Sequence, residues 1–128
     1  MIAVDTSILV AVISAEPDAL ALIEHLSNND ICLPASVLVE AAILATNRGL
    51  RRDLDLLLES LSALIIPLDE AIARLAQDAH ERYGKGRHKA SLNFGDCLVY
   101  ATAKYLSLPL FYKGNDFRHT DCLSFLPK

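Results

Sequence analysis

The sequence has little of what disulfide-bonded, zinc-binding or membrane proteins need. Only three of its 128 residues are Cys, and no two of them stand in a Cys-x-x-Cys spacing. We therefore predict neither a disulfide framework nor a zinc site, and we expect reduced thiols in the cytoplasm. The apolar stretches are short and interrupted by charge, which predicts no membrane-spanning segment. No basic region precedes the apolar run that begins at Ile2, so a secretory signal is not expected.

Aromatic residues are also scarce, at 6% with no Trp, although 52% of the residues are hydrophobic. Ala, Leu, Ile and Val must therefore fill the core, as in proteins whose helices pack on a mostly parallel sheet. The chain is long enough to bury a sizeable core, and it contains no repeat or low-complexity linker. A single domain over residues 1–128 is predicted.

Short apolar runs alternate with amphipathic segments along the chain. Strands are predicted at residues 2–4, 31–33, 64–68 and 108–112, with a short fifth at 122–126. Helices are predicted to begin near Thr6, Pro17, Pro34, Leu50, Asp69 and Asn93. This alternation is typical of an α/β fold, a three-layer α/β/α sandwich around a mostly parallel sheet of four to five strands.

One of these predictions concerns which face of a helix is buried. Pro17 is favourable at a first helical position, and Leu20, Ile23 and Leu26 recur at helical spacing after it. We therefore expect these three side chains to face the core.

Positive charge is not in excess, since the formal net charge is −4, which argues mildly against a nucleic-acid partner. The positive residues are, however, clustered along the sequence. Lys85, Arg87 and Lys89 stand in one short Gly-rich segment, and a second cluster of Arg residues lies at positions 48–52. Such patches can hold a phosphate chain, although both segments are equally well explained as solvated loops.

Four acidic residues stand in contexts that are unusual for surface carboxylates. Asp5 ends an apolar strand, Glu40 lies inside an apolar helical run, Asp96 is in the first turn of a helix, and Asp116 follows another short strand. Burying a carboxylate is costly unless something positive neutralises it, and a shared Mg²⁺ would do so through oxygen ligands. The set predicts metal-assisted hydrolysis of a phosphodiester.

Each of these acids also has an ordinary explanation. Asp5 and Asp96 suit helix amino termini, Asp116 suits a turn, and Glu40 could face solvent. In parallel sheets, sites form beyond the carboxyl ends of the strands, so Asp5 and Asp116 are expected at one edge. Whether Glu40 and Asp96 join them depends on helix packing, which the sequence does not determine.

Four segments together resemble a known family. The segments DTSIL, PASVLVE, NFGDCLVYATAK and LFYKGNDFRHTD resemble PIN-domain ribonucleases, and most closely the VapC-like toxins of bacterial toxin–antitoxin pairs. The resemblance implies a PIN-like fold and Mg²⁺- or Mn²⁺-dependent endonucleolytic cleavage of RNA in the cytoplasm. It also implies a cognate antitoxin that folds over the site, and a toxin homodimer.

The same resemblance implies roles for individual residues. The four acidic positions of the family fall on Asp5, Glu40, Asp96 and Asp116, as metal ligands and catalytic residues. Residue type and charge, separately from the resemblance, make Thr6, Ser7, Asn115, Lys85, Arg87 and Lys89 candidates for substrate contacts, although capping and turn formation also explain Thr6 and Asn115. Asp121 is a further acid that could support the site from behind, and His119 is the His nearest to Asp116 in the sequence.

Two other functions are compatible with this layout. A receiver-type phosphoacceptor domain would place Asp69 after the third strand and Lys113 after the fourth. However, Thr6 and Ser7 stand where that architecture needs adjacent acids, and Asp69 is explained more simply as a helix N-cap. The other alternative is a non-catalytic PIN-like module that binds RNA or protein, against which the intact set of four acids argues.

Overall fold

Four short strands form a parallel sheet in the order β3-β2-β1-β4. The computed structural model describes residues 1–126. The strands are β1 (Ile2–Val4), β2 (Ile31–Pro34), β3 (Leu64–Ile66) and β4 (Leu110–Phe111). Ala3 of β1 lies opposite Cys32 of β2 on one side and Leu110 of β4 on the other. The predicted parallel sheet is confirmed.

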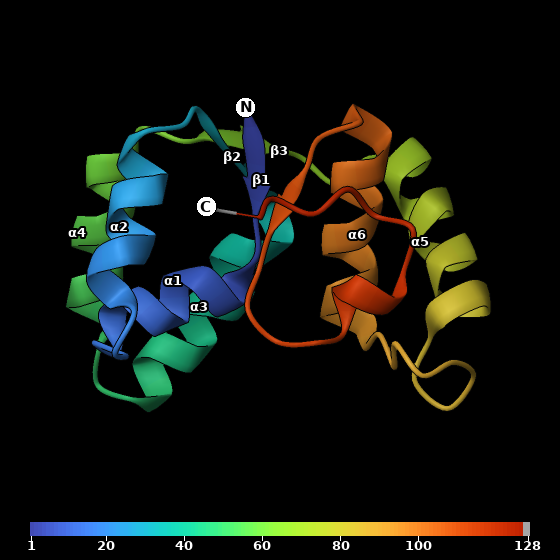
Figure 1. The fold of residues 1–128 in the computed structure, drawn as a ribbon, viewed down its shortest axis with the longest axis horizontal. Coiled ribbons are helices and arrows are strands. Elements are labelled where there is room, and N and C mark those ends of the chain that lie inside the picture. Colours follow the sequence, from blue (N-terminus) through green and yellow to red (C-terminus); the bar gives the residue numbers. More distant parts are fainter. Residues whose placement is uncertain (127–128) are drawn as a thin grey trace.

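Six helices cover this sheet on both faces. They are α1 (Thr6–Ile13), α2 (Ala19–Ser27), α3 (Ala35–Asn47), α4 (Arg51–Leu61), α5 (Glu70–Tyr83) and α6 (Phe94–Leu106). In Figure 1, α1 to α4 lie on one side of the strands and α5 and α6 on the other, which gives the predicted three layers. Within residues 1–126, no helix is long and apolar enough to cross a membrane.

Local sequence explains where the last two long helices begin. The Asp69 carboxylate accepts a hydrogen bond from the Ile72 N–H at 2.9 Å and so caps α5. Asn93 and Asp96 form a reciprocal capping box at the start of α6, in which each side chain accepts from the backbone N–H of the other residue. The sequence predicted both starts, because Asp and Asn are favoured N-cap residues.

The core is aliphatic, as the composition predicted. The inner strand β1 is completely or almost completely buried, and side chains such as Leu9, Leu33 and Val99 belong to the core around it. Cys32 and Cys97 are buried and Cys122 is half-buried, and all three are free thiols. Burial raises the pKa of the Cys32 and Cys97 thiols, which keeps them protonated and unreactive.

The prediction for the buried face of α2 is partly wrong. The helix begins at Ala19, because Pro17 and Asp18 lie in the preceding turn, where the Ala19 N–H donates to the Glu16 carbonyl. Its buried residues are Ala19, Leu22 and Leu26, whereas Leu20 is 83% exposed. Of the three predicted core positions, only Leu26 is correct.

The predicted fifth strand does not form. The segment around Ser124 makes only an isolated bridge to Leu110. Both of its backbone hydrogen bonds are with Leu110, whose N–H donates to Leu123 and whose carbonyl accepts from Phe125. The carbonyl of Phe111, the other residue of β4, accepts from the Asp5 N–H at 3.0 Å and so serves the opposite side of the strand.

Candidate functional site

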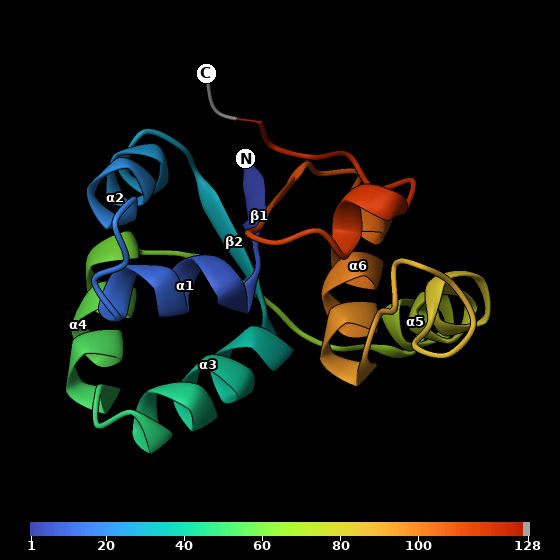
Figure 2. The ribbon, with the colours of Figure 1, turned by 60° about the horizontal axis from the view of Figure 1, so that its bottom comes forward.

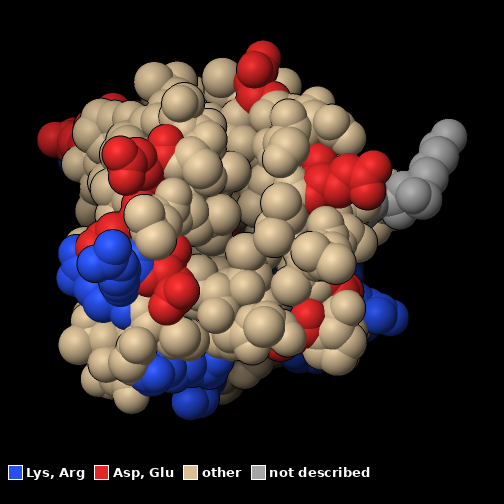
Figure 3. All heavy atoms as spheres, turned by 90° about the vertical axis from the view of Figure 1, so that its left-hand side faces the viewer, with Lys and Arg blue, Asp and Glu red and all other residues tan. Residues whose placement is uncertain are grey.

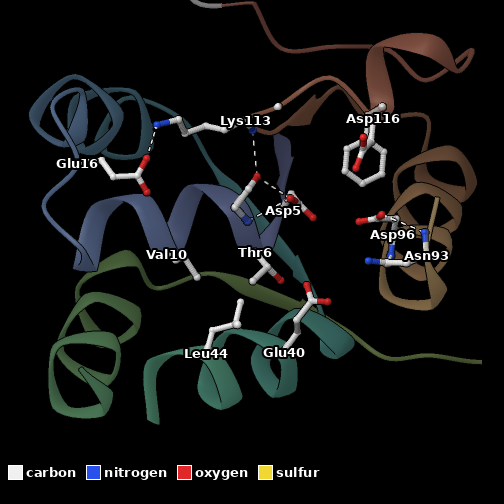
Figure 4. Close-up of a pocket in the computed structure, with 13 residues that line it drawn as sticks. Asp5, Thr6, Val10, Glu16, Glu40, Leu44, Asn93, Asp96, Lys113 and Asp116 are labelled. Atoms are coloured by element: carbon white, nitrogen blue, oxygen red, sulfur yellow. Dashed lines mark hydrogen bonds and ion pairs between the residues drawn. The ribbon is translucent and has the colours of Figure 1, made fainter. Parts of the chain in front are cut away.

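All four predicted acids line one open pocket of about 440 Å³, which we call the acid pocket. Asp5 joins β1 to α1, Glu40 lies on α3, Asp96 is in the first turn of α6, and Asp116 precedes a short 3-10 helix (Phe117–His119). Figure 4 shows their carboxylates directed toward a common space. The pocket is lined by Asp5, which follows β1, and by Lys113, which follows β4, so it lies at the carboxyl ends of these strands, the position that parallel sheets favour for ligands. Figure 2 shows α1 and α3 starting at this same edge of the sheet, after β1 and β2.

Asp5 is the most deeply placed of the four carboxylates, with 6% of its surface exposed. Its Oδ2 accepts hydrogen bonds from the Ser7 N–H at 3.1 Å and the Ser7 hydroxyl at 2.6 Å. The Ser7 hydroxyl in turn accepts from the Lys113 N–H at 2.9 Å, which ties Asp5 to the segment after β4. Burial raises the pKa of Asp5 despite these bonds, and the nearby charge of Glu40 raises it further.

Asp96 is half-buried and is held by the start of its own helix. Its Oδ2 accepts from the Asn93 N–H at 3.1 Å, and its own N–H donates to Asn93 Oδ1 at 2.8 Å. Burial raises the pKa of Asp96 to about 6, and the charges of Asp5, Asp116 and Glu40 act in the same direction. The four carboxylates are therefore close enough to influence one another electrostatically.

Glu40 reaches the pocket because Gly95, the second residue of α6, lies beside it. A methyl group built on Gly95 would come within 2.5 Å of Glu40 Oε2 and 3.3 Å of its carboxyl carbon. The absence of a side chain at Gly95 therefore leaves the space that the Glu40 carboxylate occupies. This contact between α3 and α6 brings Glu40 next to Asp96, which the sequence alone could not establish.

Asp116 is exposed, although its sequence context was unusual for a surface carboxylate. It is exposed at the mouth of the pocket, although its neighbour Phe117 is buried. The turn that carries it begins at Gly114, whose backbone φ of +99° is one that residues other than glycine rarely adopt. A solvated Asp116 needs no neutralising partner of its own.

Two further charged residues line the pocket and were not predicted to do so. Lys113 lines its wall, but its ammonium group binds Glu16 at 2.8 Å and Asp18 at 2.9 Å, and in Figure 4 it is directed away from the four acids. Glu16 lines the wall as well. The position of Lys113 two residues after the end of β4 is the signal that could have identified it, since strand ends form this edge.

Thr6 supplies the clearest sign that the pocket takes a polar ligand. It lines the acid pocket and is only 3% exposed, yet its hydroxyl has no hydrogen-bond partner within residues 1–126. Buried hydroxyl groups are nearly always hydrogen-bonded, so an unpaired one calls for an explanation. A ligand oxygen or an ordered water in the acid pocket would supply its partner.

The donor set of the pocket suits a hard divalent cation. All four groups offer oxygen ligands, the type that Mg²⁺ prefers, and none of the four forms an ion pair in the described part of the chain. No group of three or more His, Cys, Asp or Glu side chains in residues 1–126 is already placed to hold a metal ion. Like charges repel, and this repulsion keeps the carboxylates apart when no cation lies between them. They would therefore move closer together when a cation binds.

Several other predicted residues lie away from the acid pocket. Asn115 does not line it and accepts a hydrogen bond from Arg118 at 3.1 Å. Lys85, Arg87 and Lys89 are exposed in the loop between α5 and α6. They therefore do not contact the four acids, and a role for them would have to lie further along a bound substrate.

The expectation that Asp121 supports the site is wrong. Its carboxylate accepts hydrogen bonds from the Tyr100 hydroxyl and, at 2.8 Å, from Lys104, outside the acid pocket. Although its partial burial acts to raise the pKa of Asp121, these hydrogen bonds and the charges of Lys104 and Arg82 lower it to about 2. Asp121 instead fastens the carboxyl-terminal segment to α6.

The raised pKa of Asp96 predicts how stability depends on pH in metal-free buffer. Its pKa is about 6 in the folded chain and 3.8 in the unfolded one, so the folded state holds the proton more tightly. This contribution to the free energy of unfolding is complete below pH 4 and is lost as the pH rises through 6; because Asp96 is only half-buried and solvent screens part of the effect, the loss should be about 1–2 kcal/mol. Urea unfolding with a chelator present should show it.

The variant Asp96→Asn provides the comparison for that measurement. It should be more stable than the unsubstituted chain at pH 7, and the difference should shrink as the pH falls to 4. A difference that stays constant over this range would contradict the assigned pKa.

Comparison with known proteins identifies relatives over nearly the whole chain. A sequence profile of the PIN domain matches residues 2–122. Ribonuclease VapC of Mycolicibacterium smegmatis is 42% identical over 122 residues, which cover 92% of this chain and 95% of the relative. Ribonuclease VapC30 of Mycobacterium tuberculosis is 41% identical, with 92% and 93% of the two chains covered.

Solved structures show the same fold at lower sequence identity. The VapC20 toxin of Mycobacterium tuberculosis, whose structure is described as that of a sarcin-ricin loop cleaving toxin, superposes with a TM-score of 0.80 at 15% identity and covers 99% of this chain and 100% of its own. A chain from a toxin–antitoxin complex of Klebsiella pneumoniae superposes with a TM-score of 0.75 at 20% identity, covering 98% and 97%. These likenesses establish the fold.

Proposed function

The chain belongs to the PIN-domain family and, within it, to the VapC ribonucleases, and on this basis we propose that it is a metal-dependent endoribonuclease that acts as the toxin of a toxin–antitoxin pair. The observation that carries the proposal is the acid pocket. Asp5, Glu40, Asp96 and Asp116 line it from four separate segments, and no Lys or Arg in residues 1–126 forms an ion pair with any of these four. We propose that residues 1–128 form one such domain.

We assign Asp5 and Asp96 as the principal ligands of Mg²⁺ or Mn²⁺, with Asp116 and Glu40 completing the site. Both principal ligands have one oxygen held by hydrogen bonds, from Ser7 and from Asn93 respectively, which leaves the other oxygen to bind. The bound cation would activate a water molecule and offset the negative charge that grows on the phosphate during cleavage.

The remaining residues of the pocket would position these groups and the substrate. The Ser7 hydroxyl already donates its only proton to Asp5, so its main role is to orient that carboxylate. Thr6 has a free buried hydroxyl that could donate to a phosphate oxygen or to a water. Asn115, Lys85, Arg87 and Lys89 would contact the RNA backbone outside the acid pocket.

We propose a cognate antitoxin as the protein partner and a homodimer as the assembled toxin, in the cytoplasm. Solved structures with this fold include toxin–antitoxin complexes. The face formed by α2 and α4 is a suitable surface for binding another protein chain, because its centre is largely uncharged in Figure 3 and it exposes Leu20, Ile23 and Leu56. Exposed apolar side chains on one face are typical of protein-binding surfaces.

The receiver-type alternative has less support than the ribonuclease. Asp69, its phosphoacceptor, caps α5 through the Ile72 N–H and does not line the acid pocket. Lys113, its second marker, is bound to Glu16 and Asp18. Incubation with a small-molecule phosphodonor would test it, since a labile acyl phosphate is expected only from a receiver domain.

Cleavage of RNA in defined metal conditions tests the proposed function. We expect the purified chain to shorten RNA with Mg²⁺ or Mn²⁺, to lose this activity in excess chelator, and to regain it when either metal is restored. Mapping the new ends in total RNA after brief expression should reveal the cleaved site. A protein that shields RNA without shortening it would instead be the non-catalytic binding module.

A further inference from the structure

A second and larger hollow lies beside the acid pocket, between α5 and α6, which stand side by side in Figure 1. Its volume is about 860 Å³, and we call it the α5–α6 hollow. Its apolar lining includes Ala76, Leu92 and Leu98, all of them buried. Asn93 lines both this hollow and the acid pocket, so the two meet at the amino terminus of α6.

Phe94 is the most unusual residue of this hollow. It is the first residue of α6, directly before Gly95 and two positions before Asp96. Its side chain is 82% exposed, which makes it the most exposed aromatic side chain in residues 1–126. The fold gains almost nothing from a ring left in water, so packing does not explain a Phe at this position.

The polar part of the hollow suits the edge and backbone of a nucleotide. Gln77, His80 and Glu81 of α5 line it and offer hydrogen-bond donors and acceptors of the kinds that read base edges. Lys85 lines it as well and begins the loop that carries Arg87 and Lys89, all three exposed. These cations are complementary to a phosphodiester chain leaving the hollow.

We propose that the α5–α6 hollow binds a base of the RNA strand next to the phosphodiester held in the acid pocket, with Phe94 stacking on that base. The inference rests on the proposed ribonuclease function and makes Phe94 a determinant of substrate binding. Exposed aromatic rings bind single-stranded nucleic acid by stacking, while cations follow the backbone. The three cations of the loop and the contact with the acid pocket favour RNA over a protein segment as the occupant.

Binding measurements with inactive protein test this proposal. In an Asp96→Asn background, the Kd for a short RNA spanning the mapped cleavage site should rise about tenfold when Phe94→Ala is added, because stacking on one base is lost. Phe94→Tyr should keep most of the affinity. Tyr105→Ala is the matched control, since Tyr105 is a 51% exposed aromatic in the last turn of α6, outside the hollow.

An RNA with one base removed makes the test specific to stacking. An abasic nucleotide at one position beside the cleaved bond should weaken binding by a similar factor when Phe94 is present. It should cost little when Phe94 is already Ala, because both changes remove the same contact. Unchanged affinity of Phe94→Ala, or fully additive effects of the two changes, would overturn the proposal.

The same variants separate the other possible occupants. If Phe94→Ala weakens binding of the cognate antitoxin but not of RNA, the hollow is a protein site and the proposal is wrong. A fall in molecular mass in analytical ultracentrifugation would assign the hollow to a second copy of the chain and would equally refute the proposal. Failure of the unsubstituted protein to cleave any RNA would refute the ribonuclease itself, before any Phe94 variant is compared.

Discussion

Asp96→Asn is expected to lower the rate of RNA cleavage by about 10³-fold or more, the scale of losing a main electrostatic contributor to a transition state. The amide oxygen of Asn can still accept the hydrogen bond from the Asn93 N–H, so the start of α6 should be preserved. What the substitution removes is the negative charge that a divalent cation requires. Asp5→Asn should act in the same way, since the amide oxygen can keep the bonds from Ser7.

The fold of both variants should be intact and slightly more stable in the absence of metal. In the folded chain burial opposes the ionised form of each carboxylate, so replacing either one relieves that cost. Titration with Mn²⁺, followed by calorimetry, gives a readout independent of cleavage, and it should show weaker binding in both variants. Asp78→Asn, which removes the same charge from an exposed position on α5, is the control and should leave metal binding unchanged.

Two outcomes would contradict this assignment. One is full cleavage by both variants after the protein has been stripped of metal and Mg²⁺ has been restored. The other is loss of activity together with loss of the folded state, which would indicate a structural role for these acids. Circular dichroism and urea unfolding separate the second outcome from a loss of chemistry.

The sequence predicted the parts of the site that depend on local structure. Asp5 and Asp116 follow strands, and the carboxyl ends of parallel strands meet at one edge, so their proximity could be expected. The capping positions of Asp69 and Asn93 follow from residue type in the same way. The parallel sheet and the aliphatic core also follow from the composition and from the alternation of short apolar runs with amphipathic segments.

The rest depended on packing between distant segments. The placement of Glu40 beside Asp96 requires α3 to approach the first turn of α6, and no pattern in either helix specifies that contact. From its sequence position after the fourth strand, Lys113 was compatible with a receiver domain. In the fold it lines the acid pocket and binds Glu16. Asp121 is close to Asp116 along the chain, but Lys104 and Tyr100 hold it elsewhere.

Gly95→Ala is expected to reduce cleavage by roughly tenfold to a hundredfold, as displacement of one charged group in a site commonly does. The new methyl group would meet Glu40 Oε2 at 2.5 Å, so the Glu40 carboxylate has to leave its place in the acid pocket. Glu40 has a flexible side chain and can swing away at little cost in packing. Alanine is also the better helix former, so the free energy of unfolding should stay the same or rise by up to about 1 kcal/mol.

A double-mutant cycle connects that loss to Glu40 and to no other effect of the alanine. In a Glu40→Ala background, Gly95→Ala should have almost no further effect on cleavage, because the carboxylate that it displaces is already absent. Cleavage rates for the four proteins, measured with Mn²⁺ and with a saturating RNA substrate, give the coupling directly. Equal losses from Gly95→Ala in both backgrounds would mean that the glycine serves the site through α6 itself and that the position of Glu40 is unimportant. A strong coupling would mean that the close approach of α3 to α6, which only glycine allows, is what brings the fourth carboxylate into the site.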